Sequence, residues 1–383
     1  MERMDLHLPD IAAAAMAFLA TYALIWLLQP VAHHMGWLDR PTQPRKTHRE
    51  PVPVTGGPAI FLALLLGGMA ASNPPSLHVA GLLAGALLLL VVGLLDDMYD
   101  LRWYYRIGAQ VAAALLMIFV GGVQVEQLGP MLGMKDTSVG MWSVPITVVA
   151  TVGLINAINM IDGIDGLAGS LCAAFMFMLC AAALYAGNEL IANRALMLGA
   201  AVCGFLLMNL RLPWQPRAKV FLGNSGSAML GFAAAWLAFR LTQNEGHPVS
   251  PVLALWLLPI PVMDTLVLMA TRVKRGQSPF HADRNHIHHL MLDAGFRPSG
   301  IVLSLVGFSL TTGLVAGQLM RWNVPNVLLL LAFVLLCVWW GWMTMRRARA
   351  LALFRRLRRL RRRPVAEDIP LGEDEIEDIS PPH

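Results

Sequence analysis

Apolar residues gather along this chain in long blocks that are separated by short polar connections. Each block holds about 16–24 residues, which is long enough to cross the hydrocarbon core of a bilayer as an α-helix. The pattern predicts spans at residues 9–29, 57–72, 78–95, 107–121, 142–160, 166–186, 194–210, 220–242, 249–271, 299–319 and 324–345. We therefore expect an all-α polytopic membrane protein with about eleven transmembrane helices.

Composition agrees with this prediction. Of the 383 residues, 56% are hydrophobic and only 14% are charged, and the mean hydropathy is +0.58. Soluble domains carry about 25% charged residues, so this chain has too few to cover a globular surface. An ordinary soluble domain is therefore excluded.

The distribution of Lys and Arg predicts the orientation. If the N-terminus lies outside, only five of the 29 basic residues fall on the outer side: Arg3, Lys135, Arg194, Arg240 and Arg321. Cytoplasmic loops are the ones that carry an excess of Lys and Arg. We therefore expect an outer N-terminus and a cytoplasmic C-terminus.

Residues 346–383 differ in composition from the predicted transmembrane domain of residues 1–345. RRLRRLRRR, from Arg355 to Arg363, is a basic run of helical character that we expect to lie on anionic lipid headgroups. Beside a transmembrane helix, this role is favoured over nucleic-acid binding. The acidic, proline-containing end that follows is expected to be partly disordered in the cytoplasm.

Polar clusters fall at the predicted cytoplasmic helix ends and loops, whereas the outer loops are bland. Polar groups at membrane depth are costly, so this one-sided collection indicates a site that faces the cytoplasm. The first cluster is PRKTHREPVPVTGG, from Pro44 to Gly57. It is either an ordinary positive-inside loop or an anion-binding loop that combines basic side chains with the backbone of Gly-Gly.

Adjacent carboxylates close the third apolar block in LLDDMYD, from Leu94 to Asp100. Acids at a helix C-terminus oppose the helix dipole and gain no stability from it. Two together raise the local negative potential, which suits a divalent cation or a proton acceptor. A functional role is therefore favoured over a merely solvated helix end.

Four amide and carboxylate side chains recur every three residues in NAINMIDGIDGL: Asn156, Asn159, Asp162 and Asp165. Positions i and i+3 of a helix are neighbours, so the first three are expected to share one face. Gly163 and Gly166 would loosen the backbone and let Asp165 turn toward the same pocket. This pattern exceeds what interhelical hydrogen bonding alone requires.

Two further motifs carry glycine or histidine. KVFLGNSGSAMLGF, from Lys219 to Phe232, is either an anion site at a helix N-terminus or close packing of small residues. ADRNHIHHL, from Ala282 to Leu290, lies in a basic connection. A structural zinc site needs about four ligands in tetrahedral geometry, so an anion-binding loop is favoured there over zinc or a solvated loop. If an imidazolium contributes, its effect should fade as pH rises.

Together, RKTHREPVPVTGG, LLDDMYDL, NAINMIDGIDGLAGS, VFLGNSGSAMLGF and SPFHADRNHIHHLM resemble the membrane polyprenyl-phosphate N-acetylhexosamine-1-phosphate transferases of the MraY/WecA superfamily, glycosyltransferase family 4. They occur in the family's order and cover about residues 10–345. The short HIHHL form is similar to the WecA-like branch. The resemblance therefore rests on five ordered motifs.

The resemblance implies a phosphoglycosyl transferase. Undecaprenyl phosphate would attack the β-phosphorus of a UDP-N-acetylhexosamine, with UDP-GlcNAc favoured by the branch, and release UMP. The product would be the lipid-linked sugar pyrophosphate that initiates O-antigen or related polysaccharide synthesis, and Mg²⁺ or Mn²⁺ would be required. Which sugar and pathway are used, and whether the protein is a homodimer, are left open.

The resemblance also implies site residues. Catalytic roles fall to Asp96, Asp97 and Asp162, with base and metal-associated roles not distinguished between the first two, and metal-ligand roles to Asn156, Asn159 and Asn224. Substrate-binding roles fall to Lys46, His48, Asp165, Arg284, His286, His288 and His289.

One position departs from the family's pattern, because Asn224 stands where the family's Gly-Asp-x-Gly-Ser motif has a metal-binding aspartate. An amide oxygen contributes no charge, so metal binding is expected to be weaker. Asn224 therefore keeps open a non-catalytic relative that only binds UDP-sugar. An organic-anion transporter is the other alternative, although its site would lie at the membrane midplane between repeats.

Overall fold

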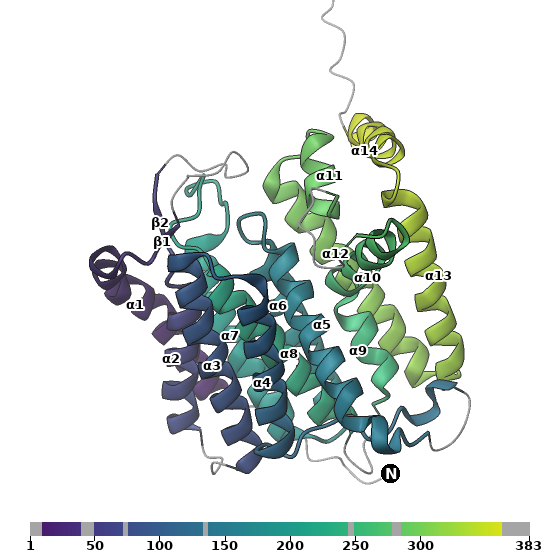
Figure 1. The fold of residues 1–383 in the computed structure, drawn as a ribbon, viewed down its shortest axis with the longest axis horizontal. Helices are drawn as coiled ribbons and strands as arrows, with labels where there is room; N and C mark the ends of the chain where they lie inside the picture. The colour runs from purple at the N-terminus through teal and green to yellow at the C-terminus, as the bar shows by residue number, and fades with distance from the viewer. Residues whose placement is uncertain are drawn as a thin grey trace, which may run out of the picture.

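The computed structural model describes residues 10–39, 50–71, 76–132, 137–243, 249–277 and 285–361, and it is almost entirely helical (Figure 1). The helices are α1 (Ile11–Met35), α2 (Gly56–Ala70), α3 (Leu77–Tyr99), α4 (Trp103–Phe119), α5 (Ser143–Ile161), α6 (Leu167–Tyr185), α7 (Glu189–Asn209), α8 (Gly223–Thr242), α9 (Pro251–Leu257), α10 (Pro259–Lys274), α11 (Ile287–Asp293), α12 (Pro298–Arg321), α13 (Asn326–Thr344) and α14 (Arg347–Arg361). Short 3-10 turns lie at η1 (Gly129–Leu132) and η2 (Gly140–Trp142), and the two-residue strands β1 (Leu38–Asp39) and β2 (Val52–Pro53) pair antiparallel.

The prediction of an all-helical membrane protein is confirmed, and each of the eleven apolar blocks is helical. Among the described residues, seven helices are long and apolar enough to cross a membrane, or eight if the bent pair α9–α10 is one span. The helices α2 and α4 are apolar but shorter. Eleven spans and the orientation of the termini therefore stay predictions.

The expected single span over residues 249–271 is broken. α9 ends at Leu257, α10 begins at Pro259, and the two helices meet at 91°. Proline lacks the N–H that would continue the helical hydrogen-bond ladder, so Pro259 and Pro261 favour a new helix start here. α10 consequently turns away from the axis of α9 and ends beside α13.

The innermost helices of the bundle are α6 and α8, whose residues are mostly buried. α8 packs between α3 and α5 and also contacts α2, which brings segments from distant parts of the sequence together. Glycines permit this close approach, since a Cβ on Gly93 of α3 would lie 2.3 Å from Ser225 Cα. Likewise, a Cβ on Gly57 would lie 2.6 Å from the backbone nitrogen of Gly226.

The basic part of the tail forms α14, which lies beside α11 at one end of the bundle (Figure 1). The ring of Phe354 packs edge-on against Phe296, and Arg358 donates a hydrogen bond to the carbonyl of Gly295 over 3.0 Å. Arg347 forms an ion pair with Asp293. The tail helix is therefore attached to the segment that carries the histidine motif.

Candidate active site

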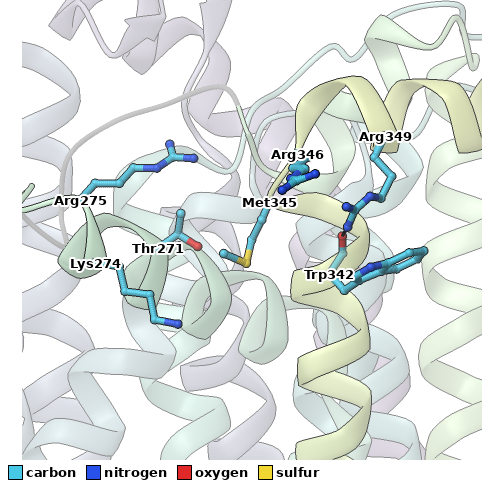
Figure 2. A pocket seen from close by; sticks show the side chains of 7 residues that line it. All are labelled: Thr271, Lys274, Arg275, Trp342, Met345, Arg346 and Arg349. Carbon is cyan, nitrogen blue, oxygen red and sulfur yellow. Dashed lines mark hydrogen bonds between the residues drawn. The ribbon is translucent and has the colours of Figure 1, made fainter.

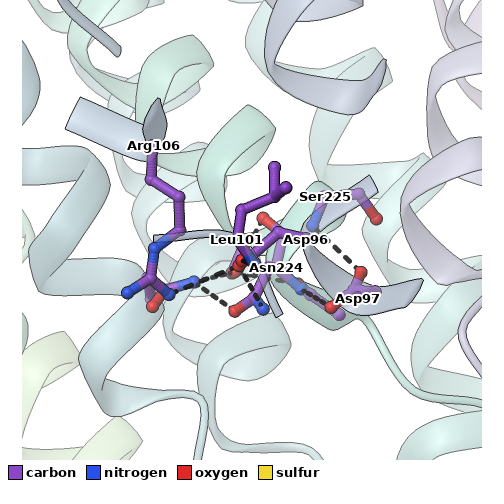
Figure 3. Close-up of polar contacts among 9 residues, drawn as sticks. Asp96, Asp97, Leu101, Arg106, Asn224 and Ser225 are labelled. Carbon is purple, nitrogen blue, oxygen red and sulfur yellow. Dashed lines mark hydrogen bonds and ion pairs between the residues drawn. The ribbon is translucent and has the colours of Figure 1, made fainter. Parts of the chain in front are cut away.

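Asp96 lies in the last turn of α3 and is almost fully buried, with 4% of its surface exposed. Its Oδ2 accepts hydrogen bonds from Asn224 Nδ2 at 2.8 Å and from Arg106 at 3.3 Å (Figure 3). Its Oδ1 accepts from the backbone N–H of Leu101 at 2.9 Å. The negative charge of Asp96 is thus compensated by Arg106 and fixed by two further donors.

Asp97 lies against the N-terminus of α8. Its two carboxylate oxygens accept hydrogen bonds from the backbone N–H groups of Asn224, at 3.0 Å, and Ser225, at 3.4 Å (Figure 3). Gly223 has φ +75°, and a Cβ there would lie 2.6 Å from Asp97 Oδ2. From the sequence, this helix N-terminus was either an anion site or a region of close packing. Its N–H groups bind the Asp97 carboxylate of the protein itself, and Gly223 allows the close approach.

Asn224 connects three elements through its side chain. Besides donating to Asp96, its Oδ1 accepts a hydrogen bond from Asn159 Nδ2 of α5 at 3.0 Å. The same Asn159 amide donates to Ser227 Oγ at 2.9 Å. The structure therefore brings Asp96, Asp97, Asn159 and Asn224 into one network at the junction of α3, α5 and α8.

Asn156 lies one turn earlier on α5 and has different partners. Its Nδ2 donates to Gln110 Oε1 of α4 at 2.7 Å and to the carbonyl of Val152 at 2.8 Å. It therefore contacts α4, whereas Asn159 contacts α8. The expected common face is shared only in part.

Asp162 is the C-cap residue of α5 and lies close enough to Asp97 to interact with its charge. Within the described part of the chain, its carboxylate has no hydrogen-bond donor and no ion-pair partner. Burial, together with the negative charges of Asp97 and Asp165, raises the pKa of the Asp162 carboxyl to about 7. When Asp162 is ionised, the described residues therefore leave its negative charge uncompensated.

Asp165 does not join the network. Its Oδ2 accepts hydrogen bonds from Arg211 Nε at 2.7 Å and from the backbone N–H of Ala218 at 3.3 Å. The expectation that Gly163 and Gly166 turn Asp165 into the pocket of the asparagines is therefore wrong in detail, because the connection between α7 and α8 attracts its carboxylate. Its charge still acts on Asp162 through space.

The histidine motif begins a helix, because His286 is the N-cap of α11. His286 Nδ1 lies 2.9 Å from Asp264 Oδ2 of α10, and the other oxygen of Asp264 accepts from Trp340 Nε1 at 3.2 Å. All three side chains are buried. His286 thus attaches α11 to α10 and α13.

His288 lies against the end of α5. A Cβ on Gly163 would lie 2.4 Å from His288 Nε2, so only glycine leaves room for the ring. The ring is fully buried, and neither nitrogen has a hydrogen-bond partner among the described residues. Burial and the nearby His289 and His286 lower the pKa of His288 well below its usual value. The ring is therefore a neutral imidazole, and the pH dependence expected of an imidazolium does not apply to it.

The remaining expected residues divide into two groups. His289 lies beside His288, with ring centroids 4.2 Å apart. Lys46, His48 and Arg284 lie outside the described residues. Their expected roles stay predictions.

Comparisons with known proteins show which family this chain is similar to. The model of the family "Glycosyl transferase family 4" matches residues 79–242, which include the network. Three similar proteins are named undecaprenyl-phosphate α-N-acetylglucosaminyl 1-phosphate transferase. The Haemophilus influenzae protein is 37% identical over 280 residues, which are 73% of this chain and 78% of the relative. The Pasteurella multocida protein is 34% identical over 352 residues (90% of this chain, 96% of the relative), and the Escherichia coli K12 protein is 32% identical over 349 residues (90% and 94%).

The chain belongs to glycosyl transferase family 4. The resemblance inferred from five motifs is thereby confirmed, and the chain is a phosphoglycosyl transferase. The comparisons support neither the transporter nor the non-catalytic relative.

The donor atoms present suit the divalent cation that the family resemblance implies. Across the described ranges, no group of three His, Cys, Asp or Glu side chains is placed to hold a metal ion. Mg²⁺, however, is commonly bound by one or two carboxylates together with water and substrate phosphates. Arg106 already compensates the charge of Asp96. Asp97 and Asp162, which have no ion-pair partner among the described residues, are therefore the two carboxylates suited to a cation.

Sequence reasoning missed the partners of several site residues. Arg106 pairs with Asp96, Arg211 with Asp165, and Asp264 with His286. Asp264 had a detectable signal, since it is a single acid inside an apolar block. The two arginines are ordinary positive-inside residues in the sequence, so only packing distinguishes them.

Proposed function

We propose that this family member transfers N-acetylglucosamine-1-phosphate from UDP-GlcNAc to undecaprenyl phosphate, which releases UMP and forms a lipid-linked sugar pyrophosphate. The names of the relatives support the acceptor and the sugar. The observation that carries the proposal is the Asp162 carboxyl group, which is unpaired among the described residues and lies close enough to Asp97 for the charge of Asp97 to raise its pKa. That arrangement suits metal-dependent chemistry on a diphosphate.

The reaction requires little proton transfer. An oxygen of the acceptor phosphate forms a bond to the β-phosphorus, and the bond from that phosphorus to the bridging oxygen breaks, so the electron pair leaves with UMP. A phosphate monoester has a second pKa of about 6, so the acceptor is largely ionised at neutral pH. Positioning and charge stabilisation are then the main requirements.

The three carboxylates differ in environment, and we assign their roles accordingly. Asp97 and Asp162 are the candidates for holding Mg²⁺ or Mn²⁺, and Asn156 and Asn159 of α5 are kept as candidate amide ligands. The bound cation would neutralise charge on the diphosphate as the bridging bond breaks. Asp96, fixed by Arg106 and Asn224, takes a proton from any acceptor molecule that arrives protonated.

Asn224 has a positioning role in this proposal. Its amide donates to Asp96 and accepts from Asn159, so it links α3 and α5 through α8. An aspartate could not donate to Asp96. Because Asn224 replaces the family's aspartate, this chain has a neutral amide that hydrogen-bonds Asp96 and Asn159 in place of a charged metal ligand.

The histidine-bearing helix α11 supports binding of the nucleotide sugar. His288 is a neutral ring whose nitrogens have no hydrogen-bond partner among the described residues, so it has an N–H to donate to a diphosphate or sugar oxygen. Further cationic or polar contacts to the substrate are proposed for Lys46, His48, Arg284 and His289. Asp165, which is paired with Arg211, is also proposed to contribute to substrate binding.

The site lies at the helix ends that the positive-inside pattern predicts to be cytoplasmic. We therefore propose an inner-membrane protein with residues 1–345 as its transferase domain, the tail of residues 346–383 in the cytoplasm, and product entry into a cell-surface polysaccharide pathway. UDP-sugars are made in the cytoplasm, which agrees with this orientation.

A panel of UDP-sugars tests the proposal. Purified full-length protein is incubated with undecaprenyl phosphate, Mg²⁺ and one UDP-sugar at a time, and both UMP and lipid-linked sugar are measured. We expect equal amounts of the two products with UDP-GlcNAc, and none after metal chelation. Absence of lipid product with every UDP-sugar would overturn the proposal, whereas product with another sugar would change only the donor.

A further inference from the structure

A cavity of about 410 Å³ lies where α10 ends and α13 continues into α14 (Figure 2). One wall is formed by Thr271, Lys274 and Arg275, and the other by Trp342, Met345, Arg346 and Arg349. None of these seven side chains forms a described hydrogen bond or ion pair with Asp96, Asp97 or Asn224. The lining of the cavity therefore includes none of the residues assigned to the candidate active site.

The lining of this cavity is cationic. It contains four basic side chains and no acidic one. Among the described residues, Lys274, Arg275 and Arg346 have no carboxylate partner. The neighbouring Arg347, in contrast, forms an ion pair with Asp293. Within the part of the chain that the structure describes, no acidic side chain compensates the positive charge of these three residues.

One of the four cations is held in place. Arg349 donates a hydrogen bond to the carbonyl of Trp342, and its guanidinium lies 4.4 Å from the centre of the indole ring (Figure 2). Such stacking orients a guanidinium while leaving its remaining N–H groups free to donate. Arg349 is therefore prearranged to bind a planar or tetrahedral oxyanion.

The position of the cavity points to the membrane surface. α13 is apolar enough to cross a bilayer and ends at Thr344, whereas the next helix is rich in arginine. Trp342 is 57% exposed at this boundary, and exposed tryptophan is favoured at the level of lipid headgroups. Below it, α13 presents exposed Leu335 and Val338, which suit contact with acyl chains.

We propose that this cavity binds the phosphate headgroup of an anionic membrane phospholipid, with its acyl chains along α13. Lys274 and Arg275 approach the phosphate from α10, and Arg346 and Arg349 from the other wall. The bound lipid joins α10 to the α13–α14 corner. A substrate role is not needed, because the lining includes none of the proposed catalytic carboxylates.

Native mass spectrometry of the full-length protein in detergent tests this proposal, with phosphatidylglycerol and phosphatidylcholine as probes. We expect phosphatidylglycerol to bind at least about tenfold more tightly than phosphatidylcholine, because each hydrogen bond between charged groups contributes about a factor of ten or more. The double variant Lys274→Gln/Arg346→Gln should weaken phosphatidylglycerol binding by about tenfold or more. The matched control Arg355→Gln/Arg356→Gln removes the same charge from exposed positions of α14 and should change binding less than about twofold.

Equal weakening by both double variants would mean diffuse attraction to a basic helix and would overturn the proposal. So would equal binding of the two lipids by the wild-type protein, which needs no variant. Complete displacement of the lipid by millimolar inorganic phosphate would indicate a site for a soluble anion. A rise in the KM for undecaprenyl phosphate with unchanged phosphatidylglycerol binding would assign the cavity to the acceptor.

Discussion

Asn224 donates its side-chain amide to Asp96 over 2.8 Å, so a neutral donor stands between the two carboxylates of α3. Replacing Asn224 by Asp removes this hydrogen bond and places a third carboxylate beside the proposed metal ligands. We expect Asn224→Asp to lower the Mg²⁺ concentration for half-maximal activity several-fold, because a charged ligand attracts the cation more strongly. A metal titration of UMP release measures this, and an unchanged requirement would place Asn224 outside contact with the metal.

Without a bound metal, the same Asn224→Asp variant should lower the thermal stability of the protein. Asp96 loses a donor, and three carboxylates then repel one another at a buried junction. We expect the melting temperature without Mg²⁺ to fall relative to wild type and to recover on adding Mg²⁺. A melting temperature that ignores Mg²⁺ would contradict a cation bound at this network.

Removing the acidic side chains should abolish most activity. Asp96→Asn, Asp97→Asn and Asp162→Asn are each expected to lower turnover by about 100-fold or more, the scale of losing a positioned charge or base. The amount of protein in the membrane should stay unchanged. Asp165→Asn is a useful comparison, because Asp165 is already paired with Arg211 and lies outside the network. Near-normal turnover of all three variants would show that the site is assigned wrongly.

The pKa of Asp162, raised to about 7, predicts a pH-dependent metal requirement. A metal must displace the proton below this pKa, so the Mg²⁺ concentration for half-maximal activity should fall by up to about tenfold per pH unit as pH rises toward 7, and level off above it. Metal-free protein should become less stable over the same pH range. Folding favours the protonated carboxyl of Asp162, so the free energy of unfolding falls as pH rises from about 4 to 7. Asp162→Asn should remove both dependences, and a metal requirement that is flat with pH in the wild type would contradict the assignment.

His288→Ala should act on the nucleotide sugar. A hydrogen bond to a charged group contributes about 1.5–3 kcal/mol, so use of UDP-GlcNAc should weaken by roughly 10- to 150-fold, mainly through KM. Because the pKa of His288 is lowered, this loss should be the same at pH 6 and pH 8. One equivalent of zinc per chain, lost on mutation of His286 and His288, would instead identify a zinc site. Steady-state kinetics at both pH values, with metal analysis of the purified protein, distinguish the two.

The membrane orientation is tested with reporter fusions. A reporter that is active only outside the cytoplasm should work when fused near residue 135 and fail near residue 285, because the basic loops are predicted to lie inside. The reverse pattern would place the active-site end of the bundle outside.

The helical fold could be predicted from the sequence because it depends on local signals, and local signals also mark the candidate carboxylates. Long apolar blocks specify helices, and acids at the end of an apolar helix, such as Asp96 and Asp97, are costly without a function. The break at Pro259 was not predicted, since the apolar run continues through it and only the direction of the chain changes. A proline at this point was the available signal.

Pairings between helices could not be predicted in the same way. Whether Asp165 turns to α5 or to Arg211 depends on how the α7–α8 connection packs, and no local pattern encodes that choice. The same holds for Asp264 and His286, which are 22 residues apart and belong to different helices. The histidine motif was expected to be a loop, but His286 caps a helix whose anchor is the buried Asp264.

The central claim, transfer of a phosphosugar rather than a sugar alone, is tested most directly by the position of a label. Purified protein is given UDP-GlcNAc labelled with ³²P at the β-phosphorus, together with undecaprenyl phosphate and Mg²⁺, and the lipid and aqueous phases are separated. Our account predicts that the label enters the lipid phase while unlabelled UMP accumulates, and that Asp162→Asn prevents both. Label that stays in aqueous UDP while the sugar enters the lipid would contradict it.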